Sequence, residues 1–228
     1  MIEMEEVFKK YPNGIVAANG ISVSIKQGEF VYVVGPSGAG KSTFIKMMYR
    51  EELPTKGTIM INGVNLEKLK PNKVPMLRRQ IGVVFQDFKL LPTLTVFENV
   101  AFAMEVIEEH PDHIKKRVME VLALVGLKQK ARMLPSELSG GEQQRVSIAR
   151  SIVNNPKVVI ADEPTGNLDP ETSWEIMKIF EEINRNGTTV VMATHNREIV
   201  NAIKHRVIAI ESGMITRDEQ RGDYGYES

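Results

Sequence analysis

The chain has 228 residues, 29 Lys+Arg against 29 Asp+Glu, and no cysteine. This length allows one large domain or a core with a smaller lobe. The zero net charge argues against a protein whose main function is to bind nucleic acid. The lack of cysteine excludes disulfides and thiolate metal sites. The acidic N-terminus lacks the apolar core of a signal peptide, and no apolar run approaches the ~18 residues that span a bilayer. We therefore expect a cytosolic protein, which could still bind a membrane partner.

Short apolar runs alternate with helical patterns along the chain, as is typical of an α/β fold with a largely parallel sheet. Two early stretches indicate hairpins instead, with Asn13-Gly14 and Asn62-Gly63 as their turns, and predict an additional antiparallel sheet. Continuous Val and Ile runs predict strands buried on both faces. They lie at residues 30–35, 81–85, 158–162, 188–193 and 206–211.

From about residue 88 to residue 138 the pattern becomes helical. One face of a predicted helix comprises Ile114, Val118, Val121, Leu122 and Val125, and Gly126 is its expected stop. The sequence thus predicts one domain over residues 1–217. Its β subdomain and core comprise residues 1–87 and 155–217, a helical lobe is inserted at 88–154, and a flexible tail follows at 218–228.

The stretch GPSGAGKST fits the phosphate-loop pattern and stands between a predicted strand and a predicted helix. Its glycines let successive backbone N–H groups turn around a phosphate, and the helix N-terminus adds positive potential. We expect Lys41 to reach the β- and γ-phosphates and Ser42 to ligate Mg²⁺. The candidate binding residues are Gly35, Pro36, Ser37, Gly38, Ala39, Gly40, Lys41, Ser42 and Thr43. A glycine-rich turn with an accidental lysine is the alternative.

Four polar residues stand at the ends of other predicted strands. Asp162 and Glu163 follow the strand at 158–162, at the edge where open α/β sheets bind ligands. Asp162 is a candidate metal ligand, and Glu163 is a candidate base for the attacking water. His195 could contact the γ-phosphate, and Gln86 could reach the metal or the water. The alternative for Asp162 and Glu163 is a pair of side chains that point into solvent at a strand end. For His195 it is a histidine that caps a strand end, and for Gln86 an ordinary polar residue at a strand end.

A second glycine loop, at residues 139–142, opens another predicted helix. Ser139 and Glu142 have capping-box spacing, which by itself predicts a well-capped helix. A capping box does not explain why Gly140 and Gly141 are glycines. Glycines at the start of a helix leave the backbone N–H groups accessible, and such N–H groups bind anions. Because the first loop already holds the chain's own nucleotide, we expect the second to serve a nucleotide held by another subunit.

The stretch LSGGEQQR, which contains this second loop, resembles the signature motif of the ABC ATPases, and the resemblance covers nearly the whole chain. It implies a P-loop NTPase core of the RecA type with an antiparallel β subdomain and an inserted α-helical subdomain. It also implies that Tyr11 stacks on adenine, that Gln86 and Asp169 belong to the Q-loop and D-loop, and that His195 is the switch histidine. In that family two subunits sandwich two ATP molecules head to tail, so an ATP-dependent homodimer that uses ATP and Mg²⁺ is expected.

Several stretches, among them RRQIGVVFQDFKLLPTLTVFENV, resemble the FtsE family of cell-division ATPases, and the ending GDYGYE resembles its Gram-positive members. This resemblance implies the integral membrane partner FtsX, a peripheral position on the cytoplasmic side of the membrane, and ATP-driven signalling through FtsX to peptidoglycan hydrolases. The alternative is an ATPase of lipoprotein-releasing or macrolide-efflux exporters, which share ADEPTGNLD. An ABC ATPase of DNA or ribosomes is disfavoured because the sequence has neither a second cassette nor a basic excess. A scaffold without turnover is disfavoured because Glu163 and His195 are both in place.

A dense apolar set follows Gln86. If several of its members are exposed together, they would form a groove for a short amphipathic helix of the membrane partner. The set comprises Phe88, Leu90, Leu91, Phe97, Phe102 and Met104.

Overall fold

The computed structural model describes residues 1–225, which form two compact units. Unit 1 comprises Met1–Arg78 and the chain from Thr189 onward, and unit 2 comprises Arg79–Thr188. The sequence set the limits of the helical lobe at residues 88 and 154 instead. The units divide elsewhere because helix α5 (Gly140–Ile152) contacts both strand β6 (Ile81–Val84) and helix α6 (Pro170–Arg185).

Unit 1 contains the predicted antiparallel sheet, in the order β2-β1-β4-β5. Asn62 and Gly63 connect the last hairpin, and both have the left-handed backbone that a two-residue primed turn requires (φ 52° and 75°). Strands β1 and β2, on either side of Asn13-Gly14, also pair antiparallel, so both predicted hairpins are present. The strands are β1 (Ile2–Lys10), β2 (Val16–Ile25), β4 (Lys56–Ile61) and β5 (Val64–Asn65).

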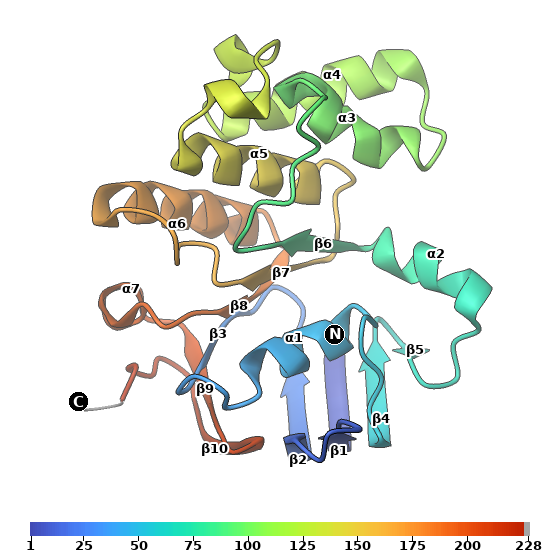
Figure 1. Cartoon of the computed structure of the whole chain (residues 1–228), viewed down its shortest axis with the longest axis vertical. Helices are drawn as coiled ribbons and strands as arrows, with labels where there is room; N and C mark the ends of the chain where they lie inside the picture. The colour runs from blue at the N-terminus through green and yellow to red at the C-terminus, as the bar shows by residue number, and fades with distance from the viewer. Residues whose placement is uncertain (226–228) are drawn as a thin grey trace. The chain divides into compact units, whose positions relative to one another are not determined.

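Unit 1 also contains four strands in the order β10-β9-β3-β8. Strand β3 runs parallel to β8 and to β9, and β10 forms a hairpin with β9. Every residue of β3 and β8 is buried, as their continuous apolar runs predict. These strands are β3 (Phe30–Val34), β8 (Thr189–Ala193), β9 (Arg206–Glu211) and β10 (Met214–Glu219); the helices of the unit are α1 (Lys41–Met48), the 3₁₀ turn η1 (Pro71–Lys73), α2 (Val74–Arg78) and α7 (Arg197–Ala202) (Figure 1).

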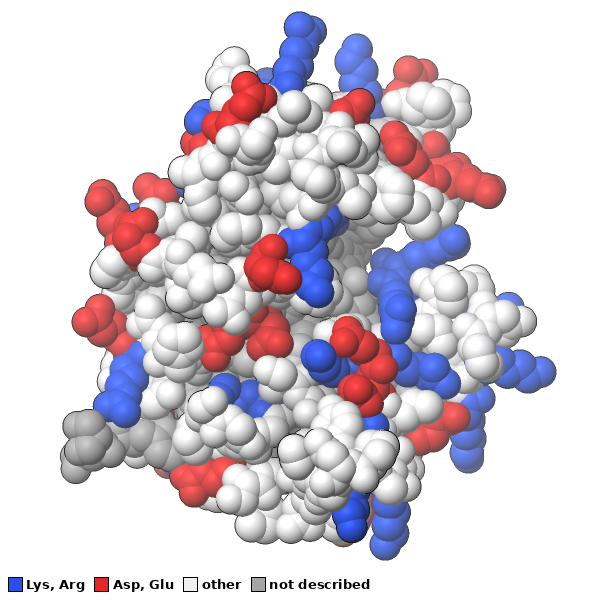
Figure 2. Space-filling view, in the orientation of Figure 1, with Lys and Arg blue, Asp and Glu red and all other residues white. Residues whose placement is uncertain are grey.

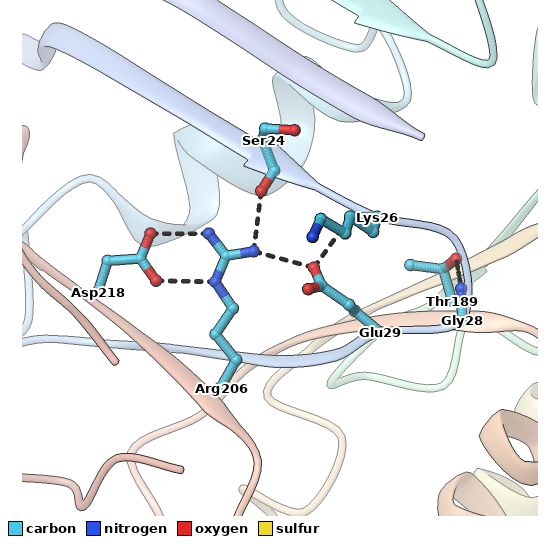
Figure 3. Close-up of polar contacts among 7 residues, drawn as sticks. All are labelled: Ser24, Lys26, Gly28, Glu29, Thr189, Arg206 and Asp218. Carbon is cyan, nitrogen blue, oxygen red and sulfur yellow. Dashed lines mark hydrogen bonds and ion pairs between the residues drawn. The ribbon is translucent and has the colours of Figure 1, made fainter. Parts of the chain in front are cut away.

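One arginine connects several strands of unit 1 (Figure 3). The Arg206 guanidinium donates to both carboxylate oxygens of Asp218 on β10 at 2.7 Å each. It also donates to Glu29 at 2.9 Å and to the carbonyl of Ser24 on β2 at 2.8 Å. The Asp218 carboxylate, with help from Glu29, raises the pKa of Arg206. Arg206 thereby joins β9, β10, β2 and the turn before β3.

Residues 218–225, predicted as part of a loose tail, make defined contacts in unit 1. Residues 218 and 219 end strand β10, and the side chain of Tyr224 is only 6% exposed. The backbone N–H of Tyr224 donates to Asn201, and the Arg197 guanidinium lies 5.3 Å from the centre of the tyrosine ring. The structure differs from the prediction here because one aromatic side chain packs a polar segment onto α7. The last three residues of the predicted tail lie outside the described part of the chain.

Unit 2 combines the parallel strands β6 and β7 (Val158–Asp162) with helices that include the predicted helical region (Figure 1). Helix α3 contacts both α4 and α5. Helix α4 buries Ile114, Val118, Val121 and Leu122, which confirms the predicted face, and it ends at Leu124, before Gly126. The remaining elements are α3 (Val96–Glu105), α4 (Pro111–Leu124) and the 3₁₀ turns η2 (Lys128–Lys130) and η3 (Pro135–Glu137).

Acidic and basic side chains are interspersed on the face of the molecule that Figure 2 shows. Within residues 1–225, no helix has both the length and the apolarity that crossing a bilayer requires.

Candidate active site

The phosphate loop of unit 1 follows β3 and leads into α1. A Cβ atom on Gly35 would lie 2.1 Å from the carbonyl oxygen of Ile210, and one on Gly40 would lie 2.2 Å from that of Ala17. These neighbours are backbone atoms, so they cannot move aside as a flexible side chain would. Both positions therefore require glycine, and the loop is fixed against β9 and β2.

The start of α1 concentrates positive charge beside this loop. Lys41 Nζ donates to the carbonyl oxygens of Gly35 and Pro36 at 2.8 and 3.0 Å, which holds the ammonium against the loop. The first turn of α1 has no acidic residue and no side-chain cap. Its N–H groups therefore add the positive potential of a helix N-terminus, and Ser42 is exposed beside them.

Tyr11 is anchored to this same helix. Its hydroxyl lies 3.2 Å from the Thr43 hydroxyl oxygen, and the Lys9 ammonium lies 4.9 Å from the centre of its ring. Lys9 is itself held by Glu52 at 2.6 Å and by the carbonyl of Leu53 at 2.8 Å. Because a cation occupies one face of the ring, a base would stack on the opposite face. The sequence predicted Tyr11 but gave no sign of Lys9, whose role depends on contacts 43 and 44 residues away.

His195 lies at the edge of the sheet from which the phosphate loop starts. Strands β3 and β8 are parallel with Val33 opposite Ala193, so their carboxyl ends coincide. The N–H of Thr194 donates to the carbonyl of Val33 at 3.2 Å, which fixes the backbone just before the exposed His195. The expected proximity of this histidine to the start of the phosphate loop follows from the parallel register.

In unit 2, Gln86 and Asp162 lie at another shared edge. Strands β6 and β7 are parallel with Val84 opposite Ala161, so the segments that follow begin side by side. The Gln86 amide donates to the Asn167 side chain at 3.4 Å, and the Asn167 amide donates to the carbonyl of Gln86 at 3.3 Å. This reciprocal pair joins the predicted Q-loop to the predicted D-loop. The resemblance to the ABC ATPases placed Asn167 in the D-loop, but its pairing with Gln86 was not predicted, because their spacing of 81 residues carries no local signal.

Glu163 has an unusual backbone. Its φ of 51° is left-handed, which non-glycine residues seldom adopt, and the following Pro164 restricts it further. The N–H of Gly166 donates to the carbonyl of Glu163 at 3.1 Å and closes a four-residue turn. A strained backbone of this kind is typical of functional sites, where the surrounding structure holds it in place.

The second glycine loop forms the predicted capping box on α5. Ser139 Oγ accepts from the N–H of Glu142 at 3.3 Å, and the Glu142 carboxylate accepts from the N–H of Ser139 at 3.1 Å. Lys130 donates to the other Glu142 oxygen at 2.5 Å, and this bond is the main reason why the pKa of Glu142 is lowered. Ser139 and Gly140 remain exposed at the helix start.

The structure corrects the sequence argument about the two glycines. A Cβ atom on Gly141 would lie 2.3 Å from a methyl carbon of Thr172 on α6. Packing against α6 therefore favours glycine at this position, which the sequence did not reveal. Gly140 has no contact closer than 3.6 Å, so packing does not require glycine there. Within this pair, the argument for an anion-binding loop therefore depends on Gly140.

Asp169 caps helix α6. Its carboxylate accepts the N–H of Thr172 at 2.9 Å, and hydrogen bonding to Thr172 lowers the pKa of Asp169. Asp169 is thus the N-cap of α6, directly before Pro170 at the first helical position. A role in the D-loop stays a prediction.

The residues of each unit fit the ligands expected of them. The glycine cradle, Lys41 and the uncapped start of α1 suit the phosphates of a nucleotide. Asp162 and Gln86 offer the oxygen donors that Mg²⁺ prefers, because the Gln86 amide nitrogen is engaged by Asn167 and its oxygen is the atom suited to a metal. Ser42 offers a further oxygen in unit 1.

Comparisons with known proteins agree with this chemistry. The model of the ABC transporter family matches residues 18–166. The chain is 75% identical to the cell division ATP-binding protein FtsE of Bacillus subtilis over 225 residues, 99% of each chain. It is 64% identical to FtsE of Streptococcus pneumoniae over 227 residues, 100% of this chain and 99% of the relative. Among solved structures, a dimeric post-hydrolysis state of the ATP-binding cassette MJ0796 with ADP and Pi superposes with a TM-score of 0.88 at 35% identity, covering 97% of this chain and 99% of that one.

The fold is thus that of an ABC nucleotide-binding domain, which confirms the predicted fold class. The family match together with these relatives identifies an ATP-binding ATPase. The chain belongs to the ABC transporter family and, within it, to the FtsE family of cell-division ATP-binding proteins.

Proposed function

We propose that the chain hydrolyses ATP as one half of a homodimer that is bound peripherally, on the cytoplasmic side, to an FtsX-type membrane protein. Closure of the dimer around ATP would change the conformation of that partner and so signal to peptidoglycan hydrolases outside the cell. One observation supports the proposed dimer. A single chain has a complete phosphate loop and also a second exposed loop, at Ser139 and Gly140, whose backbone N–H groups could bind the nucleotide of another subunit. The cell-division role rests on the names of its relatives.

In this mechanism Lys41 and the N–H groups of the phosphate loop hold the nucleotide phosphates. Glu163 accepts the proton of the attacking water, and His195 orients the γ-phosphate. Ser42, Gln86 and Asp162 would hold Mg²⁺, which neutralises charge on the phosphates when bound. Ser139, Gly140, Gly141, Glu142 and Asp169 would face the nucleotide of the partner subunit.

Light scattering in ATP and Mg²⁺ tests the dimer. Glu163→Gln should slow hydrolysis by ~10²–10⁴-fold, so ATP persists and dimers accumulate. Lys41→Ala should lose affinity for the phosphates and remain monomeric. In the Glu163→Gln background, Ser139→Arg should block the second loop, so the double variant should bind ATP as a monomer.

The single variants separate the possible failures. Ser139→Arg alone should bind ATP with an affinity close to that of the wild type and should not hydrolyse it. A stable dimer of Ser139→Arg/Glu163→Gln would reduce the second loop to a helix cap. Unchanged hydrolysis in Glu163→Gln would remove this residue from the role of general base.

The apolar set expected to bind the membrane partner divides in the structure. Met104 is buried and belongs to the core. Phe102 is 45% exposed, whereas Phe88, Leu90, Leu91 and Phe97 are half-buried. Of the six, only Phe97 lines a groove in unit 2 that has a volume of about 1010 Å³.

The lining of this groove suits an amphipathic helix of the proposed membrane partner. Its apolar side chains include Phe97, Ile114 and Met119. Acidic residues come from α3 and the loop that follows it, and basic residues come from α4 and the segment after it. They are Glu98, Glu105, Glu109, Lys115, Lys128 and Arg132. A helix with an apolar face and charges of both signs along its flanks matches this arrangement.

Co-purification of FtsX from membranes tests the groove. Met119→Glu and Phe97→Asp should abolish co-purification and leave ATP binding unchanged. Phe102→Asp is the matched control: it places a charge on the same lobe outside the groove lining and should retain FtsX. If ATP binding and co-purification are lost together, the substituted residues are simply part of the core. Retention of FtsX by both groove variants would place the docking site elsewhere.

A further inference from the structure

We propose that Gln144 is a positioning residue for ATP hydrolysis, because it holds the turn that presents Glu163. This inference rests on the proposed role of Glu163 as the general base. Gln144 lies in the second turn of α5 and is fully buried. Its side-chain amide donates to the carbonyl oxygen of Pro164 at 2.8 Å, one residue after Glu163. All of these residues belong to unit 2.

The accepting carbonyl has a specific place in the turn. Glu163, Pro164, Thr165 and Gly166 form a four-residue turn that the hydrogen bond from Gly166 to Glu163 closes. Pro164 occupies the second position, so its carbonyl belongs to the central peptide of the turn. The orientation of that peptide is what distinguishes a type I turn from a type II turn. The amide of Gln144 therefore selects one conformation of the turn.

The residue at the start of this turn is the one that needs support. Glu163 has a left-handed backbone and precedes a proline, two conditions that act against each other. Pro164 and Thr165 are buried, while Glu163 is only half-buried. A fixed peptide immediately after Glu163 restricts the directions in which its carboxylate can point. The hydrogen bond of Gln144 thus acts on the backbone of the proposed base without contact with the substrate.

Gln144 is also a poor choice of residue if it serves only to fill space. Its Oε1 atom is buried and has no hydrogen-bond partner among the described residues. Buried acceptors without partners are unfavourable, and methionine would fill a similar volume without one. The value of glutamine at this position therefore lies in its donor, and the donor is directed at Pro164.

The test is Gln144→Met, which keeps the length of the side chain and removes the donor. A displacement of the proposed base should lower kcat by about 10- to 100-fold. The Kd for ATP should stay within about 2-fold, since the phosphate loop belongs to unit 1. Ser147→Ala is the matched control: Ser147 is equally buried one turn later on α5, and its hydroxyl also has no partner among the described residues. Its kcat should not change.

A double-mutant cycle separates positioning from a general structural role. If Gln144 acts through Glu163, then Gln144→Met should change the residual rate of Glu163→Gln by less than about 2-fold, because residues that act as a unit are not additive. Gln144→Met/Glu163→Gln should still dimerise in ATP, since Ser139 and Gly140 are unaltered. If Gln144→Met unfolds the chain, Gln144→Asn, whose amide is too short to reach Pro164, replaces it in the same cycle.

Three results overturn the inference: an unchanged kcat in Gln144→Met, an equal loss in both backgrounds, or an equal loss in Ser147→Ala. The proposed base fails in a different way. In that case Glu163→Gln alone would leave hydrolysis unchanged, whatever Gln144→Met does.

Discussion

Tyr11 depends on its neighbours for the position of its ring. Lys9 reaches over one face, and the hydroxyl group is hydrogen-bonded to Thr43 in the first turn of α1. The aromatic ring is therefore attached to the helix whose N-terminus faces the phosphate loop. This connection restricts the distance from the stacking surface to the phosphate loop.

Removal of the ring should weaken nucleotide binding. Stacking of a base on an aromatic side chain contributes about 1–3 kcal/mol, so Tyr11→Ala should raise the Kd for ATP by about 10-fold. Tyr11→Phe keeps the ring and should change the Kd by less than about 3-fold. Other purine triphosphates should bind moderately well, because stacking tolerates different bases. Equilibrium dialysis with ATP measures all of these values, and an unchanged Kd in Tyr11→Ala would place the base elsewhere.

Charged hydrogen bonds connect two elements of the fold to segments elsewhere in the sequence. The β9–β10 hairpin is joined to β2 by Arg206, whose side chain is 10% exposed. The start of α5 is joined to the 3₁₀ turn η2 by the bond between Glu142 and Lys130. Neither connection has a local sequence pattern, because Arg206 and Ser24 are 182 residues apart and Glu142 and Lys130 are 12 residues apart.

Loss of the arginine should destabilise unit 1. Arg206→Met retains the aliphatic part of the side chain but removes the guanidinium donors of Asp218 and Glu29, which leaves Glu29 with the Lys26 N–H, and this should lower the free energy of unfolding by about 1.5–3 kcal/mol. Lys26→Met nearby is the control, since that side chain is exposed, and it should stay within about 0.5 kcal/mol. Urea unfolding of the two variants compares these effects. Equal midpoints would mean that water replaces the arginine completely.

The contact at the start of α5 should make stability depend on pH. The Lys130 bond lowers the pKa of Glu142 below its ordinary value of 4.5. A lowered carboxylate pKa adds stability above the unfolded pKa, and this stability is lost as the pH falls through the folded pKa. Glu142→Gln should therefore lose less stability than the wild type between pH 6 and pH 3, by about 0.5 kcal/mol for this partly exposed pair. Urea unfolding at several pH values checks this; parallel pH profiles would contradict it.

At the scale of the whole molecule, the predicted site residues are distributed over both units. Unit 1 contains Tyr11, the phosphate loop and His195, and unit 2 contains Gln86, Asp162, Glu163 and the second glycine loop. The direct contacts of the phosphates with the loop at residues 35–43 are therefore expected to stabilise unit 1. The formal net charge is zero and the pI is about 6.9, so the net charge of the chain adds no long-range attraction for the anionic nucleotide.

ATP should therefore stabilise the chain by mass action. At a concentration 100 times the Kd, ATP with Mg²⁺ should add about 2.7 kcal/mol to the free energy of unfolding and raise the midpoint of thermal unfolding. Lys41→Ala, at the same ATP concentration, should show a much smaller shift. Thermal unfolding with and without nucleotide gives both values. A shift of equal size in Lys41→Ala would mean that the phosphate loop is not the main binding site.

The sequence by itself determined the features that depend on a few neighbouring residues. Continuous Val and Ile runs predicted the buried strands β3, β7 and β8, and Asn62-Gly63 predicted a primed turn. The spacing of Ser139 and Glu142 predicted a capping box that the structure contains. These features can be predicted from the sequence because strand burial, turn geometry and helix capping depend on residues only two to four positions apart.

Only the tertiary structure decided the features that join distant segments. It assigned β6, β7 and α6 to the same unit as the helical lobe, and it packed Tyr224 against α7. It gave Gly141 a packing partner and directed Gln144 to the carbonyl of Pro164, 20 residues away. Sequence periodicity shows which side of a helix is buried, but the partner of each buried group depends on how helices and strands pack against one another. For that reason the support of Glu163 could be identified only in the folded chain.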